Sequence, residues 1–191
     1  MRILAIADLH GCPEKEIQLL ENTPYDICVF LGDIPRPAVQ RISSVIGNVP
    51  MIGVVGNHDE WNELEETNVH HIHLKRYEHM GVSFAGLSGS ERYKTGNYPM
   101  LTQSESIRLA RIIPKADILI SHDCGYHILN KKEAHEGLKG ISSYCFWNRC
   151  RLNICGHHHV DKVEKRWLAT TICIYGATII SYPEIATTKI F

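Results

Sequence analysis

Short apolar runs that end in polar residues recur along the chain. Five of them lie at residues 3–7, 27–31, 51–55, 118–120 and 152–155. Nearly continuous apolar runs of this length are typical of strands buried on both faces of a parallel sheet. The pattern therefore predicts a sheet-based fold in which each of these strands stops where the polar residues begin.

Segments with helical periodicity separate the first three runs. One opens with Pro13 followed by acidic residues, a composition typical of a helix start. The next contains Val39, Ile42 and Ile46 at helical spacing and ends at Gly47. The order strand, helix, strand, helix, strand predicts parallel pairing of the three strands.

The middle of the chain has a strand-like pattern at residues 69–89, followed by a predicted loop at residues 88–101. Thr102 and Glu105 have the spacing of a capping box, which predicts that a helix follows. A further helix is expected from about residue 137, with Trp147 on its buried side.

Closely spaced strands are predicted after residue 160 and are expected to pair antiparallel.

Polar side chains able to bind metal follow all five apolar runs. Asp8 and His10 follow the first run, Asp33 the second, Asn57 the third, His122 the fourth, and His157 and His159 the fifth. Ligands in α/β sheets collect beyond the carboxyl ends of the strands, so we expect these side chains to meet at one edge. If the backbone stays extended through the triplet, His157 and His159 project to one side and His158 to the other.

The number and type of these side chains favour a centre of two metals. Seven ligands exceed the four that one closed zinc site needs. Asp33 is the candidate bridge, because a carboxylate has two oxygens, and Asn57 adds a neutral oxygen that leaves positive charge to attract phosphate. The mixed nitrogen and oxygen set favours manganese and also suits iron, zinc or nickel. Ordinary turns would favour Ser, Asn, Asp and Gly over histidine.

Five blocks of the sequence, in this order, resemble the signature of the calcineurin-like metallophosphoesterases, and of small bacterial-type members in particular. The blocks are Asp8-x-His10, Gly32-Asp33, Gly56-Asn57-His58-Asp59, Ser121-His122 and Gly156-His157-x-His159. They span nearly the whole chain. The resemblance implies an α/β (α+β) fold, namely a four-layer αββα sandwich of two mixed β-sheets flanked by helices. The length of 191 residues and the hydrophobic content of 44% predict a single domain over residues 1–191.

The resemblance also implies a role for each site residue. Asp8, His10, Asp33 and His159 would hold one metal, and Asp33, Asn57, His122 and His157 the other. His58 would act near the leaving oxygen as the catalytic residue, donating a proton or stabilising charge. Arg92 and Tyr93 lie in a segment that also looks like small bacterial members, and are predicted to bind the substrate.

One segment departs from the family pattern. Asp123, Cys124 and Gly125 follow His122, where many relatives carry two prolines. The departure leaves the shape of this loop and the substrate preference open.

The function that the resemblance implies is hydrolysis of a phosphodiester or phosphomonoester by a hydroxide bound at a two-metal centre. A non-catalytic interaction scaffold and a nuclease are the alternatives. A scaffold is expected to lack ligands, whereas every ligand is present. The formal net charge of -1 offers no basic field for nucleic acid, so nucleic acid is not favoured as a partner. The sequence gives neither the physiological substrate nor the oligomeric state.

The remaining features bear on location and on the other histidines. The apolar segment after Met1 is too short for a signal peptide or a membrane span, which predicts a cytoplasmic protein without a membrane partner. Seven cysteines, an odd count, indicate reduced thiols. His71 and His73 alternate on a predicted strand and are interpreted as a solvated face. The role of His135 is open.

Overall fold

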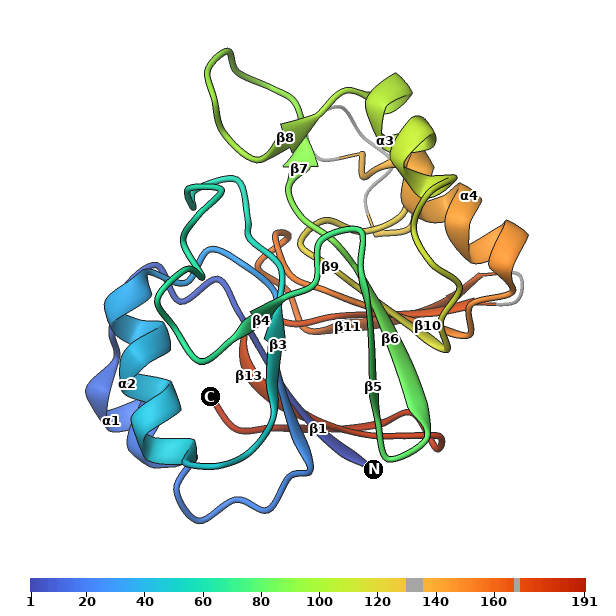
Figure 1. The fold of residues 1–191 in the computed structure, drawn as a ribbon. Coiled ribbons are helices and arrows are strands. Elements are labelled where there is room, and N and C mark those ends of the chain that lie inside the picture. Colours follow the sequence, from blue (N-terminus) through green and yellow to red (C-terminus); the bar gives the residue numbers. More distant parts are fainter. Residues whose placement is uncertain (130–135, 167–168) are drawn as a thin grey trace.

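Two six-stranded sheets lie face to face in the computed structural model of the protein (Figure 1). The structure describes residues 1–129, 136–166 and 169–191, and His135 lies outside these residues. The first sheet has the order β14-β13-β1-β2-β3-β4. Its strands are β1 (Arg2–Ala7), β2 (Ile27–Phe30), β3 (Met51–Gly53), β4 (His70–His71), β13 (Gly176–Ser181) and β14 (Ala186–Lys189).

The second sheet has the order β11-β12-β10-β9-β6-β5. Its strands are β5 (Arg76–His79), β6 (Val82–Leu87), β9 (Ile118–Ser121), β10 (Leu152–Cys155), β11 (Lys162–Arg166) and β12 (Ala169–Cys173). Both sheets are mixed. Parallel strands form the centre of each, whereas β13, β14, β5 and β11 add antiparallel pairs toward the edges.

Alternating side chains of the central strands supply two different cores. On β1, Ile3 and Ala5 point into the core between the sheets, whereas Leu4 and Ile6 point to the helices outside. Helices α1 (Glu14–Gln18) and α2 (Arg36–Ile46) cover the first sheet, and α3 (Gln103–Ala110) and α4 (Lys139–Asn148) cover the second (Figure 1). This arrangement confirms the predicted four-layer αββα sandwich.

Local signals in the sequence correspond to several of the observed elements. Thr102 caps α3 through a complete capping box with Glu105, in which Thr102 Oγ1 accepts a hydrogen bond from the backbone N–H of Glu105 at 3.2 Å. The pairs β11–β12 and β13–β14 are antiparallel, as expected. However, β12 and β13 lie in different sheets, so these consecutive strands do not pair with each other.

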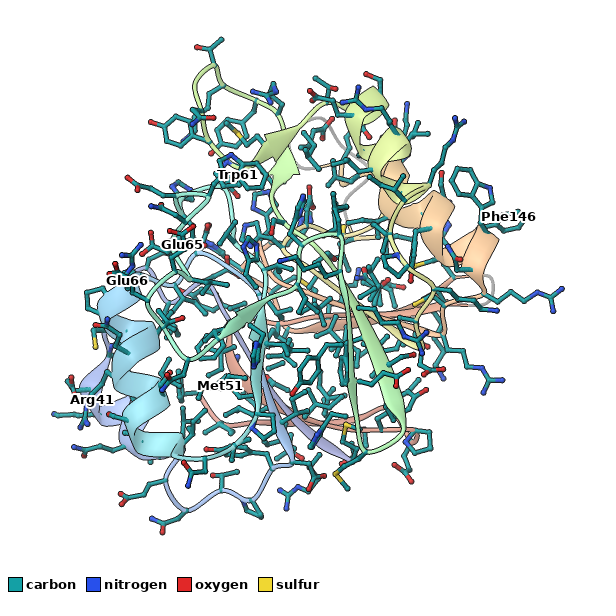
Figure 2. The ribbon with its side chains drawn as sticks, viewed as in Figure 1. Arg41, Met51, Trp61, Glu65, Glu66 and Phe146 are labelled. Atoms are coloured by element: carbon teal, nitrogen blue, oxygen red, sulfur yellow. The ribbon has the colours of Figure 1, made fainter. Side chains whose placement is uncertain are left out.

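Three expectations were wrong. The ends of the predicted loop at residues 88–101 pair with each other as β7 (Ser90–Glu91) and β8 (Met100–Leu101). Trp147 is 50% exposed, because the buried stripe of α4 runs through other positions, and its neighbour Phe146 projects outward from the same helix (Figure 2). His71 and His73 are half-buried and do not form a solvated face, since both contact Ser88.

Two general expectations can be compared with the described residues. All seven cysteines are free thiols, of which only Cys12 is exposed. The helix α2 has 11 residues, and none of the helices in the described ranges has the length and apolar character that crossing a bilayer requires.

Candidate metal centre

The predicted ligands all follow the carboxyl ends of parallel strands. β1, β2 and β3 of the first sheet lead to Asp8, His10, Asp33 and Asn57, whereas β9 and β10 of the second lead to His122, His157 and His159. The loops of the two sheets are joined directly, because the backbone N–H of His157 donates to Asp8 Oδ2 at 2.8 Å. The strand ends of both sheets therefore meet at one place.

One group of ligands consists of Asp8, His10 and His159. Their ligand atoms all lie within 4.8 Å of one another. His10 Nε2 lies 3.1 Å from His159 Nε2, and His159 Nε2 lies 3.8 Å from Asp8 Oδ1. The carboxylate of Asp8 is buried, whereas both imidazoles are exposed. A cation bound here would contact the buried Asp8 carboxylate and would be accessible to solvent on the side of the two imidazoles.

A second group forms around His122. His122 Nδ1 lies 2.8 Å from the carbonyl oxygen of Leu31 and can only donate to it, so Nε2 carries a lone pair in the neutral ring. Nε2 faces Asn57 Oδ1 at 2.9 Å and Asp33 Oδ2 at 3.5 Å. The amide orientation of Asn57 follows from its Nδ2, which donates to Tyr93 Oη at 3.1 Å. With a neutral His122 ring, three possible ligand atoms thus converge on one point, an arrangement that a cation would stabilise.

The triplet of histidines does not continue the strand. β10 ends at Cys155, and both His157 (φ 67°) and His159 (φ 51°) have left-handed backbone conformations, so the condition of an extended backbone through the triplet is not met. The ring of His157 nevertheless lies 4.9 Å from the ring of His122, centroid to centroid. The ring of His158 contacts Asp123 instead, with His158 Nε2 at 3.1 Å from Asp123 Oδ1.

Left-handed conformations are concentrated among the candidate ligands. Asp8 (φ 56°), His10 (φ 49°), Asp33 (φ 54°), His157 (φ 67°) and His159 (φ 51°) all have positive φ. Such conformations are uncommon for residues other than glycine and cost roughly 1–2 kcal/mol each. Strain that recurs in the loops after three separate strands indicates that the surrounding structure fixes these side chains for a function.

Two glycines allow the loops to approach one another. A Cβ on Gly156 would lie 2.6 Å from Asp8 Oδ2 and 2.7 Å from Ala7 Cβ. A Cβ on Gly56 would overlap Asp33 Oδ1 and lie 2.6 Å from His122 Cε1. Any side chain at these positions would displace the neighbouring ligands.

The donor set fits divalent cations. Asp8 Oδ1 is buried and has no hydrogen-bond partner, which is costly for a carboxylate oxygen. Burial, together with the nearby charge of Asp33, raises the pKa of Asp8 to about 6. Asp8, Asp33 and His122 bring ligand atoms within 4.8 Å of one another. A cation among them would give the oxygen a partner and favour the ionised carboxylate.

His58 lies on the exposed side of the centre. Its backbone N–H donates to Asp33 Oδ1 at 2.9 Å, and its ring lies 5.5 Å from the ring of His10, centroid to centroid. The bond to Asp33 fixes the position of the His58 backbone relative to a candidate ligand. The imidazole therefore stands beside the centre and is open to solvent.

The structure separates the two predicted substrate residues. Tyr93 is 55% exposed and its hydroxyl contacts Asn57, so it lies at the centre. The guanidinium of Arg92 instead donates to the carbonyl oxygen of Met100 at 2.6 Å and lies 3.9 Å from Glu105. Arg92 thus has partners on β8 and α3, and its charged group is not brought to the ligands.

Sequence reasoning assigned no role to Asp59, which holds two ligand loops together. Asp59 is 7% exposed, and its Oδ2 accepts hydrogen bonds from the backbone of Asp33 at 2.8 Å and of Gly56 at 2.7 Å. Burial, with the charge of Asp33, raises the pKa of Asp59 to about 7. The only signal in the sequence was its place directly after Asn57 and His58.

Comparisons with known proteins bear on the family and the fold of the chain. Residues 1–178 match the model of the calcineurin-like phosphoesterase superfamily domain. Comparison with curated proteins gives no significant match. Among solved structures, TT1561 of Thermus thermophilus has a TM-score of 0.70 at 15% identity, over 100% of this chain and 99% of that chain.

Two further solved structures carry names that describe an activity. A novel archaeal phosphodiesterase has a TM-score of 0.57 at 12% identity, over 98% of each chain. Phosphopantetheinyl hydrolase from Mycobacterium tuberculosis has a TM-score of 0.59 at 13% identity, over 91% of this chain and 89% of that chain. At these identities the likeness establishes the fold. Because the family match covers most of the sequence, the chain belongs to the calcineurin-like phosphoesterase superfamily.

Proposed function

We propose that the protein is a hydrolase that uses two divalent metal ions to cleave a phosphodiester or phosphomonoester, with water as the nucleophile. Manganese is the favoured metal, and iron, zinc or nickel also suit the ligands. The observation that carries the proposal is the convergence of His122 Nε2, Asn57 Oδ1 and Asp33 Oδ2 on one point, where a neutral imidazole and both oxygens can act as metal ligands. The unpartnered Oδ1 of Asp8 supports it.

The ligands are proposed to divide into two sets. Asp8, His10, Asp33 and His159 would hold one cation, and Asp33, Asn57, His122 and His157 the other. When bound, such cations polarise phosphoryl oxygens and lower the pKa of a nearby water. Because Asp8 and Asp33 bring only two negative charges to two dications, a positive excess would remain to bind the phosphate group.

Residues beside the ligands would orient the substrate and handle the proton. His58 is held next to Asp33 by its backbone N–H and is exposed, so its imidazole would donate a proton to the leaving oxygen. The hydroxyl of Tyr93, next to Asn57, would contact the substrate. Arg92 would do so only after its bond to Met100 breaks, so we propose Tyr93 as the principal contact of the two.

The net charge of the chain bears on the class of substrate. We propose that residues 1–191 act as one domain in the cytoplasm on an ester that is not a nucleic acid, since the net charge is -1. An interaction scaffold would not need five ligands held in left-handed conformations. The scaffold and nuclease alternatives are therefore less well supported.

Hydrolysis of bis-p-nitrophenyl phosphate and p-nitrophenyl phosphate, each with manganese and after chelation, tests the proposal. We expect hydrolysis only with metal, and a fall in kcat of about 100-fold or more in Asn57→Ala and His58→Ala. His70→Ala, which removes an exposed histidine on β4, is the matched control and should retain the wild-type rate. Equal rates in wild type and Asn57→Ala, or protein that binds no metal by elemental analysis, would contradict the assignment.

A further inference from the structure

Asp123 and His158 form a largely buried pair of side chains next to the proposed metal ligands. Neither is among the predicted ligands. The side chain of Asp123 is 0% exposed and that of His158 is 7% exposed. Each follows a candidate ligand in the chain, because Asp123 comes after His122 and His158 after His157. The pair therefore belongs to both of the ligand loops that the second sheet provides.

The hydrogen bonds of Asp123 assign the role of donor to His158. Asp123 Oδ1 accepts a hydrogen bond from the backbone N–H of Cys124 at 2.7 Å, and Asp123 Oδ2 accepts one from the backbone N–H of Glu91 at 3.0 Å. The carboxylate of Asp123 is therefore an acceptor in both backbone hydrogen bonds, and it is also the acceptor in its contact with the His158 ring. His158 Nε2 lies 3.1 Å from Oδ1 and 3.2 Å from Cys124 Sγ. Because an ionised carboxylate can only accept, Nε2 carries the proton in the bond to Asp123.

These contacts join three loops around the centre. The bond between Asp123 and His158 ties the loop after β9 to the loop after β10. The bond from Glu91 adds β7, the strand that precedes Tyr93. A single buried carboxylate thus fixes the segments that carry three imidazole ligands and the tyrosine that contacts Asn57.

The position of His158 explains how the strained conformations beside it are maintained. His157 and His159 both have left-handed backbones, and His158 is the residue between them. Each such conformation is strained, and a neighbouring interaction must offset the strain. The hydrogen bond between His158 and the Asp123 carboxylate is charge-assisted and largely shielded from solvent, so it helps to hold this short segment in place.

The same cluster has little capacity to bind a cation of its own. Asp123, Cys124 and His158 bring ligand atoms within 4.8 Å of one another. However, both oxygens of Asp123 already accept hydrogen bonds, and Cys124 Sγ donates to the carbonyl oxygen of Gly125 at 3.2 Å. Both carboxylate oxygens and the thiol thus already take part in hydrogen bonds, and Cys124 Sγ also lies 3.2 Å from His158 Nε2. A structural role for the cluster is therefore favoured over a third metal site.

We propose that Asp123 and His158 form a positioning pair, which fixes the imidazoles of His122, His157 and His159 and thereby sets the affinity of the centre for divalent cations. The inference rests on the proposed metal centre. The pair acts through the ligands and does not touch the metal. Its loss should therefore weaken cation binding while leaving the fold in place.

Calorimetric titration of metal-stripped protein with manganese chloride tests the pair. We expect His158→Ala to bind manganese about 10–100-fold more weakly than wild type, as is typical when a partner of a metal ligand is lost. His158→Gln keeps an N–H donor at similar reach and should restore affinity to within about threefold of wild type. Asp123→Asn keeps the shape but removes the charge, and should fall between the two. His70→Ala is the control and should bind as wild type does.

The double variant Asp123→Asn/His158→Ala distinguishes a pair from two independent residues. It should bind manganese no more weakly than the weaker single variant, because the interaction is already lost there. Additive losses, or wild-type affinity in a folded His158→Ala, would overturn the inference. A third equivalent of manganese that disappears in His158→Ala would overturn it in favour of a metal site.

Circular dichroism and thermal unfolding of the metal-free proteins show whether each variant folds. If His158→Ala does not fold, the comparison passes to His158→Gln and His158→Asn, since asparagine is too short to reach Asp123. A gap of about tenfold in manganese affinity between these two supports the pair, and equal affinity overturns it. Wild-type protein that binds no manganese would refute the proposed metal centre itself, whereas equal binding by all variants would refute only the pair.

Discussion

Two groups of histidines lie near strand ends in this protein, and only one of them has the character of a metal site. At the centre, His122 Nε2 faces the oxygens of Asn57 and Asp33. In the other group, His71 Nε2 lies 3.0 Å from Ser88 Oγ, and His73 Nδ1 accepts a hydrogen bond from the backbone N–H of Ser88 at 2.9 Å.

The partners of the imidazoles make the difference. The ring of His73 receives a donor at Nδ1 and packs edge-on against Trp61, with ring centroids 5.5 Å apart. Trp61 lies on the loop after β3 (Figure 2). The bonds around His71 and His73 thus join donors to acceptors and need no cation. At His122, by contrast, Nε2 of the neutral ring faces two oxygen atoms. Histidine spacing is similar in both places, so the polarity of the partners is what identifies a metal site.

Removing one histidine from each group should give the largest difference in kcat between the two groups. His122→Ala deletes a candidate ligand and should lower kcat by roughly 1,000-fold, equivalent to about 4 kcal/mol of transition-state stabilisation. It should also reduce bound manganese in elemental analysis. His71→Ala removes a ring of the other group and should retain kcat within about threefold. Similar losses in the two variants would mean that both act through stability.

Crowding the centre without removing a ligand should have the next largest effect. Gly156→Ala places a Cβ 2.6 Å from Asp8 Oδ2, so the carboxylate or the loop must move. We expect manganese affinity to fall by about 10–100-fold in calorimetric titration. Gly11→Ala is the matched control, because it also adjoins a ligand, His10, but its nearest atom is the carbonyl oxygen of Leu9 at 3.9 Å. Unchanged affinity in Gly156→Ala would show that the loop adapts.

Much of the fold and the order of the ligands could be predicted because both are local properties. An apolar run such as that of β1 marks a buried strand without reference to the rest of the chain. The capping box at Thr102 is likewise contained within four residues. That Asp8, Asn57 and His122 lie together follows from the carboxyl-end rule for parallel strands, which needs only the strand assignments.

Features that depend on distant neighbours could not be predicted. The left-handed backbones of His157 and His159 arise where the loop must meet Asp8 and Asp123, residues far away in the sequence. The guanidinium of Arg92 suited phosphate by its chemistry, but the structure directs it to Met100. Side-chain type gives the chemistry that a residue can perform, whereas its direction is set by tertiary contacts.

Cation binding should stabilise the folded protein through the proposed metal centre and not through His71 and His73. At a manganese concentration about 100 times the dissociation constant, one bound ion adds about 2.7 kcal/mol to the free energy of unfolding. For a chain of this size we expect Tm to rise by roughly 5–10 °C, measured by differential scanning calorimetry. The increase should disappear with chelator, become smaller in Asn57→Ala because that variant loses a ligand of one of the two proposed ions, and remain in His71→Ala. An increase in Asn57→Ala as large as that of wild type would place the stabilising ion elsewhere.

The protonation of His73, in the group that consists of His71 and His73, should change the free energy of unfolding only modestly. Burial, together with the neighbouring charges of His71 and Lys75, lowers the pKa of His73 from 6.5 to about 4. The folded state therefore binds fewer protons than the unfolded state between these values, so the contribution of His73 to stability is full above pH 6.5 and is lost as the pH falls toward 4. Between about pH 7 and about pH 4.5 this loss should reach about 1–2 kcal/mol.

His73→Asn isolates this contribution. Its side-chain oxygen can still accept the backbone hydrogen bond of Ser88, but it does not titrate. In urea unfolding of the metal-free protein, the free energy of unfolding of this variant should fall less steeply than that of wild type over the same pH range. His70→Asn, at an exposed position, should follow the wild-type curve. Parallel curves for His73→Asn and wild type would mean that the imidazole takes up its proton in the folded protein as readily as in the unfolded chain. The contrast with His122 would then rest on geometry alone.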